Sequence, residues 1–252
     1  MIPVSPVPAL HGLALIEATI RSFVTYLCVG LYVILVGPPG LLFALVTGRV
    51  GPLYALARGG VAMGLKLAGI RYRVAGREHL PRARTAVYCA NHESNVDAPL
   101  LFLVLHRGLR LLFKREFARV PILGRACTIA GFIPVERGNP RQSQAAVDQA
   151  AQALARGESF LVFPEGTRSW TGQMLPFKKG PFIMAIKAQV PVVPVAIHGG
   201  RAAMARGSAI IRPVLVDVRV GEPVETTGLT HADRDRLVAA VRERIAALRS
   251  ET

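Results

Sequence analysis

The segment NHESNVD, residues 91–97, separates an imidazole from a carboxylate by five positions, directly after the apolar run at 85–90. The run predicts a buried strand, and the following DAP triplet predicts a helix start, so the turn between them can fold Asp97 back onto His92. A carboxylate that accepts from Nδ1–H fixes the imidazole tautomer and leaves Nε2 free to remove a proton. On this segment alone, a general base and a helix cap beside a surface histidine are equally compatible with the spacing.

The segment FPEGTRS, residues 163–169, follows another short apolar run and brings an acid and an arginine together around Gly166. Glycine permits a tight turn, and a guanidinium in such a loop is suited to holding a phosphate. Glu165 and Arg168 are therefore candidates for substrate binding, with a purely structural Glu–Arg pair as the alternative. Downstream, PFKKGPF adds Lys178, for which a solvated turn is an equally good explanation.

The stretch between these two segments, residues 113–138, supplies further cations. Lys114 lies near its start, and the extended run GFIPVERG ends with Arg137 before a final glycine. Arg137 is suited to a second phosphate clamp. The alternative is a solvated surface charge, which is the commoner state of a single arginine.

Four blocks in this order resemble the glycerolipid acyltransferase family. They are the Asn-His-x4-Asp block at 91–97, GFIPVER at 131–137, FPEGTRS at 163–169 and VPVVPV at 190–195. The resemblance implies transfer of a fatty acyl chain from acyl-CoA or acyl carrier protein to a glycerophospholipid hydroxyl, with the sn-2 hydroxyl of lysophosphatidic acid as the expected acceptor. No metal ion or bound cofactor is implied, because the thioester is a co-substrate.

The resemblance also implies roles for individual residues. His92 corresponds to the general base and Asp97 to the residue that orients it, while the third block helps to bind the acceptor and Arg137 contacts its phosphate. Glu93 departs from the family pattern, which often has glutamine there, and a carboxylate beside the base favours the imidazolium. The complete set of expected substrate-binding residues is Asn91, Lys114, Arg137, Glu165, Gly166, Thr167, Arg168 and Lys178.

The elements that must position these residues alternate between strands and helices from about residue 71 onward. Short apolar or alternating runs predict strands, and amphipathic stretches at 142–156 and 231–248 predict helices. We therefore expect an α/β fold with a mixed, largely parallel sheet covered by helices. Pro191 and Pro194 predict an edge or bulged strand for one run. The expected strands are IRYRVAG (70–76), TAVYCA (85–90), SFLVF (159–163), VPVVPVAI (190–197) and VLVDVRVG (214–221).

The chain before this domain is strongly apolar. Residues 22–48 carry no charge and are long enough to cross a bilayer, but the Pro38-Pro39-Gly40 triplet is expected to break the run. This pattern fits either a kinked transmembrane helix or a hairpin that dips into one leaflet. Residues 52–69 predict a second helix, lying in the membrane interface or buried in the domain. We therefore expect membrane-anchoring helices, with a membrane-associated hairpin, at 1–70 and the acyltransferase domain at 71–252.

The charge and the cysteines limit the partners and the compartment. The formal net charge of +15 calls for an anionic partner, and the common nucleic-acid motifs do not occur in the sequence, so a lipid surface is the better explanation. Basic residues concentrated after the apolar run predict the cytoplasmic side of an inner membrane for the domain. The three cysteines have no close spacing, so neither a disulfide framework nor a zinc site is expected.

Three other functions are compatible with parts of this pattern. An acyltransferase for another acceptor, such as a lysophospholipid or a lyso-ornithine lipid, would have much the same blocks. A non-enzymatic membrane adaptor would use the basic surface alone. A hydrolase is disfavoured because the sequence has no Gly-x-Ser-x-Gly nucleophile elbow.

Overall fold

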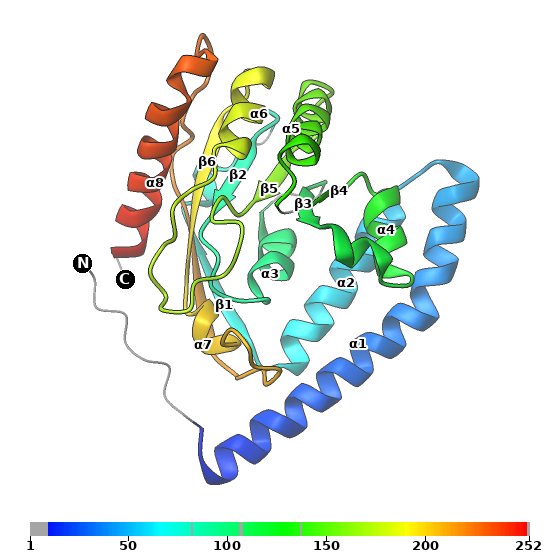
Figure 1. The fold of residues 1–252 in the computed structure, drawn as a ribbon. Coiled ribbons are helices and arrows are strands. Elements are labelled where there is room, and N and C mark those ends of the chain that lie inside the picture. The colour runs from blue at the N-terminus through cyan, green and yellow to red at the C-terminus, as the bar shows by residue number, and fades with distance from the viewer. Residues whose placement is uncertain (1–9, 82, 106–107, 137, 251–252) are drawn as a thin grey trace.

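The fold is built around a seven-stranded sheet in a computed structural model that describes residues 10–81, 83–105, 108–136 and 138–250. The strands are β1 (Arg71–Ala75), β2 (Val87–Ala90), β3 (Arg110–Lys114), β4 (Ile133–Val135), β5 (Phe160–Val162), β6 (Val192–His198) and β7 (Leu215–Val220). Their spatial order is β1-β7-β6-β2-β5-β3-β4 (Figure 1). All neighbouring strands are parallel except β6 and β7. This confirms the expected mixed, largely parallel sheet, although β3 was not anticipated.

Helices cover both faces of the sheet. They are α1 (Gly12–Thr47), α2 (Gly51–Leu67), α3 (Asp97–Val104), α4 (Leu123–Ile129), α5 (Pro140–Ala155), α6 (Gly180–Ala188), α7 (Gly200–Ala203) and α8 (Arg234–Ser250), with short 3₁₀ turns at Arg77–His79, Arg115–Arg119 and His231–Asp233. One apolar core joins the sheet to α2, α3 and α7, and a second joins it to α5, α6 and α8. The buried strand β2 contributes Tyr88 to the first core and Val87 and Cys89 to the second, as expected for a strand covered on both faces.

The strand β6 lies inside the sheet, between β7 and β2, so the edge position predicted from its two prolines is wrong. Pro191 precedes the strand and accepts a hydrogen bond from Val87 through its carbonyl. The carbonyl of Pro194 accepts from the amide of Gly221, just beyond the last β7 pair, Val195 with Val220. The ring nitrogen of Pro194 lies on the same side as this carbonyl and faces the end of β7, so the missing N–H costs only one bond at the end of the β6–β7 ladder.

The N-terminal helix α1 continues through Pro38 and Pro39, but it changes direction in its C-terminal part (Figure 1). The bent helix that these prolines predict is therefore present, and a hairpin within residues 22–48 is not. Each proline removes one hydrogen bond to a carbonyl four residues earlier. The flanking glycines compensate by allowing close packing: a Cβ at Gly40 would lie 2.8 Å from the side chain of Leu56, and Gly37 packs directly on Ile122. The expected helical hairpin exists, but it is formed by α1 with α2 rather than within residues 22–48.

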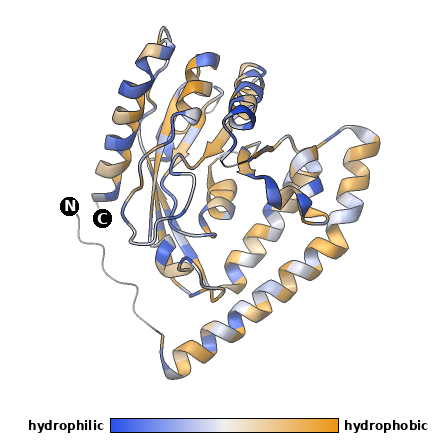
Figure 2. Cartoon of the chain, viewed as in Figure 1, coloured by the Kyte–Doolittle hydropathy of each residue, from blue (hydrophilic) through white to orange (hydrophobic). Residues whose placement is uncertain are grey.

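Helix α1 is long and apolar enough to cross a membrane (Figure 2). Most of its large hydrophobic side chains are exposed. It is nevertheless tied to the rest of the chain along its length. Near its start, Ser22 bonds both backbone groups of Ile211, and the hydroxyl of Tyr26 donates to the carbonyl of Ala209 at 2.7 Å. Beyond the prolines, Leu41 and Ala44 pack in a small core shared with α2 and α4.

Candidate active site

The predicted pair of His92 and Asp97 forms a direct contact in the turn between β2 and α3. Nδ1 of His92 lies 2.9 Å from Oδ2 of Asp97. The same oxygen accepts from the backbone amides of Glu93 at 2.6 Å and Ser94 at 2.7 Å. Asp97 is only 1% exposed, whereas the His92 side chain is 17% exposed. A buried carboxylate thus orients an imidazole that is still partly exposed. Because a carboxylate can only accept this hydrogen bond, the hydrogen is assigned to Nδ1 of His92.

The imidazole is also fixed by a ring beneath it. Phe163 follows β5, and its ring stacks on His92 with centroids 4.1 Å apart and planes inclined by 22°. No described residue hydrogen-bonds Nε2 of His92, so this nitrogen is available to a substrate. Phe163 was not among the predicted site residues, although it directly precedes the Pro-Glu-Gly turn that carries several of them.

Asn91 serves the sheet rather than the surface. Its side chain is buried, donates to the carbonyl of Ile197 at 2.9 Å and accepts from the amide of the same residue at 2.7 Å. The amide group therefore extends the pairing of β2 with β6 by one position beyond the strand. The turn is further held by Ser94, whose hydroxyl donates to the carbonyl of Met204.

Glu165 joins the histidine turn to the loop that follows β5. One carboxylate oxygen accepts from the amide of His92 at 2.8 Å, and the other accepts from the amide of Leu175 at 2.7 Å. Burial raises the pKa of this carboxyl above its usual range, and the two amide donors oppose the rise. Glu165 makes no ion pair with Arg168 among the described residues, so its observed bonds brace the backbone on which the site is built.

Gly166 and Lys178 lie against each other. Gly166 has a φ of +68°, and a Cβ there would lie 2.8 Å from Cε of Lys178. Its amide donates to the carbonyl of Phe163, which closes the turn. Thr167 follows and is partly exposed. Glycine at 166 therefore satisfies two requirements, a left-handed backbone and room for the lysine side chain.

Arg168 lies beside a second arginine, Arg206, which was not among the predicted site residues. Arg206 donates to the carbonyl of Arg168 and stacks 4.3 Å above the ring of Trp170, which is 64% exposed. Nη1 of Arg168 is buried and has no hydrogen-bond partner among the described residues. Burial, followed by the positive charge of Arg206, lowers the pKa of Arg168. Neither guanidinium pairs with a described carboxylate, so the two form a local excess of positive charge.

The remaining predicted cations lie farther from His92 or outside the described ranges. Lys114 is the last residue of β3, so it lies at the carboxyl ends of the parallel strands, where the turn after β2 also lies. Strand β5 separates β3 from β2 in the sheet. Its exposed ammonium pairs with Glu116 at 3.0 Å. Arg137 lies outside the described residues. Within those residues, no group of three or more histidine, cysteine, aspartate or glutamate side chains is arranged to hold a metal ion.

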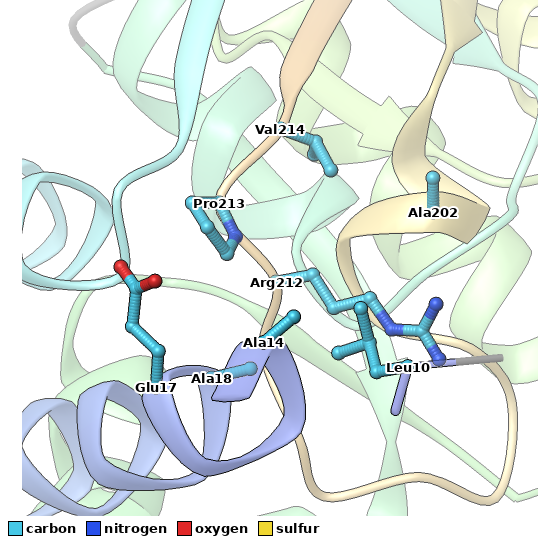
Figure 3. Close-up of a pocket in the computed structure, with 8 residues that line it drawn as sticks. All are labelled: Leu10, Ala14, Glu17, Ala18, Ala202, Arg212, Pro213 and Val214. Carbon is cyan, nitrogen blue, oxygen red and sulfur yellow. The ribbon is translucent and has the colours of Figure 1, made fainter. Parts of the chain in front are cut away.

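A separate pocket lies where α1 meets the connection between α7 and β7 (Figure 3). Ala14 and Ala18 of α1 face Pro213 and Val214 across it, and Arg212 lies at its rim. Its lining is mainly apolar and contains none of the predicted site residues. We therefore assign this hollow to the packing of α1 on the domain rather than to the site around His92.

Comparisons with known proteins identify the family of the chain. Residues 71–198 match the family described as Acyltransferase. A 1-acyl-sn-glycerol-3-phosphate acyltransferase of Limnanthes alba is 33% identical over 72% of this chain and 64% of its own length. The human 1-acyl-sn-glycerol-3-phosphate acyltransferase alpha is 36% identical over 70% of this chain and 62% of its own. The matched region thus spans less than two thirds of these curated relatives.

A solved structure extends the likeness of fold to nearly the whole chain. The crystal structure of the 1-acyl-sn-glycerophosphate (LPA) acyltransferase from Thermotoga maritima superposes with a TM-score of 0.80. The match covers 93% of this chain and 97% of the other, at 24% sequence identity. At this identity the likeness establishes a common fold and leaves the chemistry to be argued from the site.

Proposed function

The chain belongs to the acyltransferase family, and from this premise we propose that it transfers a fatty acyl chain from a thioester to the sn-2 hydroxyl of lysophosphatidic acid, giving phosphatidic acid. The observation that carries the proposal is the 2.9 Å contact between Nδ1 of His92 and the buried Asp97. It leaves Nε2 without a hydrogen-bond partner among the described residues and available as a base. Relatives named for this reaction support the choice of acceptor.

The reaction requires one proton acceptor and no covalent enzyme intermediate. Nε2 of His92 takes the proton of the acceptor hydroxyl as its oxygen attacks the thioester carbonyl carbon. The carbon–sulfur bond then breaks, and the imidazolium returns the proton to the departing thiolate. Asp97 stabilises the imidazolium while it exists and holds the ring in one orientation. The stack on Phe163 restricts the ring further, so much of the rate enhancement would come from positioning.

Preference for a phosphorylated acceptor is supported by Arg168 and Arg206. Two guanidinium groups without a carboxylate partner repel each other, and a bound phosphate would relieve this repulsion through charge-assisted hydrogen bonds. The unpartnered Nη1 of Arg168 supplies one such donor. We assign the acceptor phosphate to this pair, with Trp170 supporting the side chain of Arg206. Lys178, Thr167 and, farther away, Lys114 remain additional proposed contacts.

The thioester donor is proposed to be acyl-CoA or acyl carrier protein, without a metal ion or bound cofactor. Both donors are anionic, and the formal charge of +15 favours their approach as well as contact with an anionic leaflet. The exposed apolar surface of α1 supports attachment to the membrane. We propose that α1 and α2 anchor the catalytic domain on the cytoplasmic side of the inner membrane, where the acceptor and the product both reside.

The test is acyl transfer by the purified protein in liposomes, with lysophosphatidic acid and palmitoyl or oleoyl donors carried by CoA and by carrier protein. We expect phosphatidic acid from the wild type and a fall of roughly a thousandfold or more in His92→Ala, as for loss of a general base. His231→Ala, at an exposed histidine before α8, is the matched control and should retain activity.

Three results would contradict parts of this proposal. Acylation of only another lyso-lipid would retain the base and reject the acceptor. Full activity in His92→Ala would reject the base. Absence of acyl transfer by the wild type, together with liposome binding that survives His92→Ala, would favour the membrane adaptor.

A further inference from the structure

The C-terminal helix reaches the turn that carries His92, through its second-last residue. Nη2 of Arg249 donates to Oε1 of Glu93 at 2.9 Å and to the carbonyl of Gly172 at 3.0 Å. One nitrogen thus bridges the histidine turn and the loop that follows the Glu165–Arg168 segment. The Arg249 side chain is only 16% exposed, so the bridge is largely shielded from solvent.

Glu93 connects this bridge to the Asp97 carboxylate. Its second oxygen accepts from the amide of Arg201 at 3.3 Å, so the carboxylate is held from α8 and from α7. Its own backbone amide donates to Oδ2 of Asp97 at 2.6 Å, which is the oxygen that accepts from His92. A movement of Glu93 would therefore change the hydrogen bonding of the atom that orients the imidazole.

The Gly172 contact connects the bridge to the other side of the site. Gly172 lies in a tight turn closed by its own amide, which donates to the hydroxyl of Ser169 at 3.0 Å. Arg201 supports the same turn by donating to the carbonyl of Thr171 at 3.2 Å. This turn follows Arg168 directly, so its position governs where the proposed phosphate ligand lies relative to His92.

From these contacts we infer that Arg249 is a positioning residue, which fastens the general-base turn and the phosphate-binding loop to each other from the end of α8. The catalytic reading of this role rests on the proposed acyl transfer. The ion pair between Arg249 and Glu93 also favours the folded state, because a buried carboxylate that loses its cationic partner lowers the free energy of unfolding. The contact joins residues 156 positions apart, so it makes the geometry of the site depend on α8 being fully docked.

The experiment compares Arg249→Met with Arg249→Lys and with Arg242→Met, an exposed arginine on the same helix. We expect Arg249→Met to lower kcat for acyl transfer by roughly tenfold to a hundredfold, as for a misplacement of about 1 Å. KM for lysophosphatidic acid should change less than kcat. Arg249→Lys restores part of the loss because it retains one cationic donor, and Arg242→Met behaves as wild type. Thermal unfolding verifies that each variant is folded.

Hydrogen exchange provides a readout that does not depend on the substrate. We expect faster amide exchange in segments 91–97 and 169–175 of Arg249→Met, with the rest of the sheet unchanged and no such effect in Arg242→Met. Unchanged exchange together with unchanged kcat would overturn the inference. Faster exchange in both segments, in a protein that makes no phosphatidic acid, would reject the proposed function and retain the role of Arg249.

Discussion

Oδ1 of Asp97 lies so close to Gly200 that a Cβ at position 200 would be 2.5 Å from it. Gly200 begins α7, directly after β6, and its φ is not in the left-handed region, so its backbone alone does not require glycine. The requirement comes from the carboxylate opposite. The start of α7 therefore forms one wall of the space in which Asp97 is held against His92.

Gly200→Ala is expected to impair catalysis by displacing Asp97. The added methyl group must either move α7 or push the Asp97 carboxylate away from the three groups that donate to its Oδ2. Overpacking of this kind lowers the free energy of unfolding by about 1–3 kcal/mol. We expect kcat to fall at least about tenfold while the protein still folds. Gly30→Ala on α1, where a Cβ meets nothing within 4 Å, is the control. Activity assays with melting temperatures make the comparison, and an unimpaired Gly200→Ala would show that the site tolerates a shift of Asp97.

Arg206→Met is expected to reduce the preference for a phosphorylated acceptor. A hydrogen bond to a charged group contributes about 1.5–3 kcal/mol, so kcat/KM for lysophosphatidic acid should fall by roughly tenfold to a hundredfold. The rate with monoacylglycerol, which lacks the phosphate, should not fall. Arg73→Met, an exposed arginine of β1, is the charge-matched control. An equal loss with both acceptors would mean that Arg206 supports the loop through the Arg168 carbonyl and not the phosphate.

The stability of the protein is expected to depend on pH through Glu93. Burial raises the pKa of Glu93 to about 7 from an ordinary value of 4.5, with Arg249 of α8 and the backbone of Arg201 in α7 opposing the rise and Asp97 of α3 adding to it. Between these two values the folded protein binds a proton that the unfolded chain has released. The free energy of unfolding therefore decreases as pH rises through this window.

Glu93→Gln removes this titration and provides the measurement. The melting temperature of Glu93→Gln minus that of the wild type should increase from pH 5 to pH 7 and then become constant. Glu243→Gln, at an exposed position of α8, should give a difference that is independent of pH. A flat difference for Glu93→Gln as well would mean that Glu93 titrates near its ordinary value in the folded protein.

The contact between His92 and Asp97 was accessible to sequence reasoning because both ends of a five-residue step lie in one turn between a strand and a helix. The contacts of Glu93 and Arg168 were not, because their partners Arg249 and Arg206 come from distant positions and have no distinctive sequence pattern. The edge position predicted for β6 from its prolines was wrong for a related reason. At Pro194 the cost depends on what faces the ring nitrogen, which only the arrangement of the sheet determines.

The same distinction applies to α1, where composition gives the apolar length but not the orientation in a bilayer. At about 1.5 Å per residue, the 36 residues of α1 measure roughly 54 Å along the bent helix axis, against a hydrocarbon core of ~30 Å. Tyr26 contacts the connection to β7, and Gly37 contacts Ile122 before α4. Because both contacts are with the α/β domain, neither region of α1 can reach the bilayer centre while that domain remains outside the hydrocarbon core. We therefore predict that α1 lies along one leaflet.

Depth-dependent quenching by brominated lipids tests this orientation. In a Trp170→Phe background, which removes the single tryptophan, the variants Phe23→Trp, Leu35→Trp and Val46→Trp each place one reporter on the exposed side of α1. A helix lying along one leaflet gives three similar, shallow depths. A spanning helix would instead place the middle reporter near the bilayer centre and the outer two near opposite surfaces, which would require α1 to leave the domain at Tyr26 or at Gly37. Tyr26→Phe tests whether this one contact holds the helix, because it removes only the 2.7 Å hydrogen bond to Ala209. The reporter depths should stay unchanged in Tyr26→Phe if packing along the whole helix holds α1 on the domain.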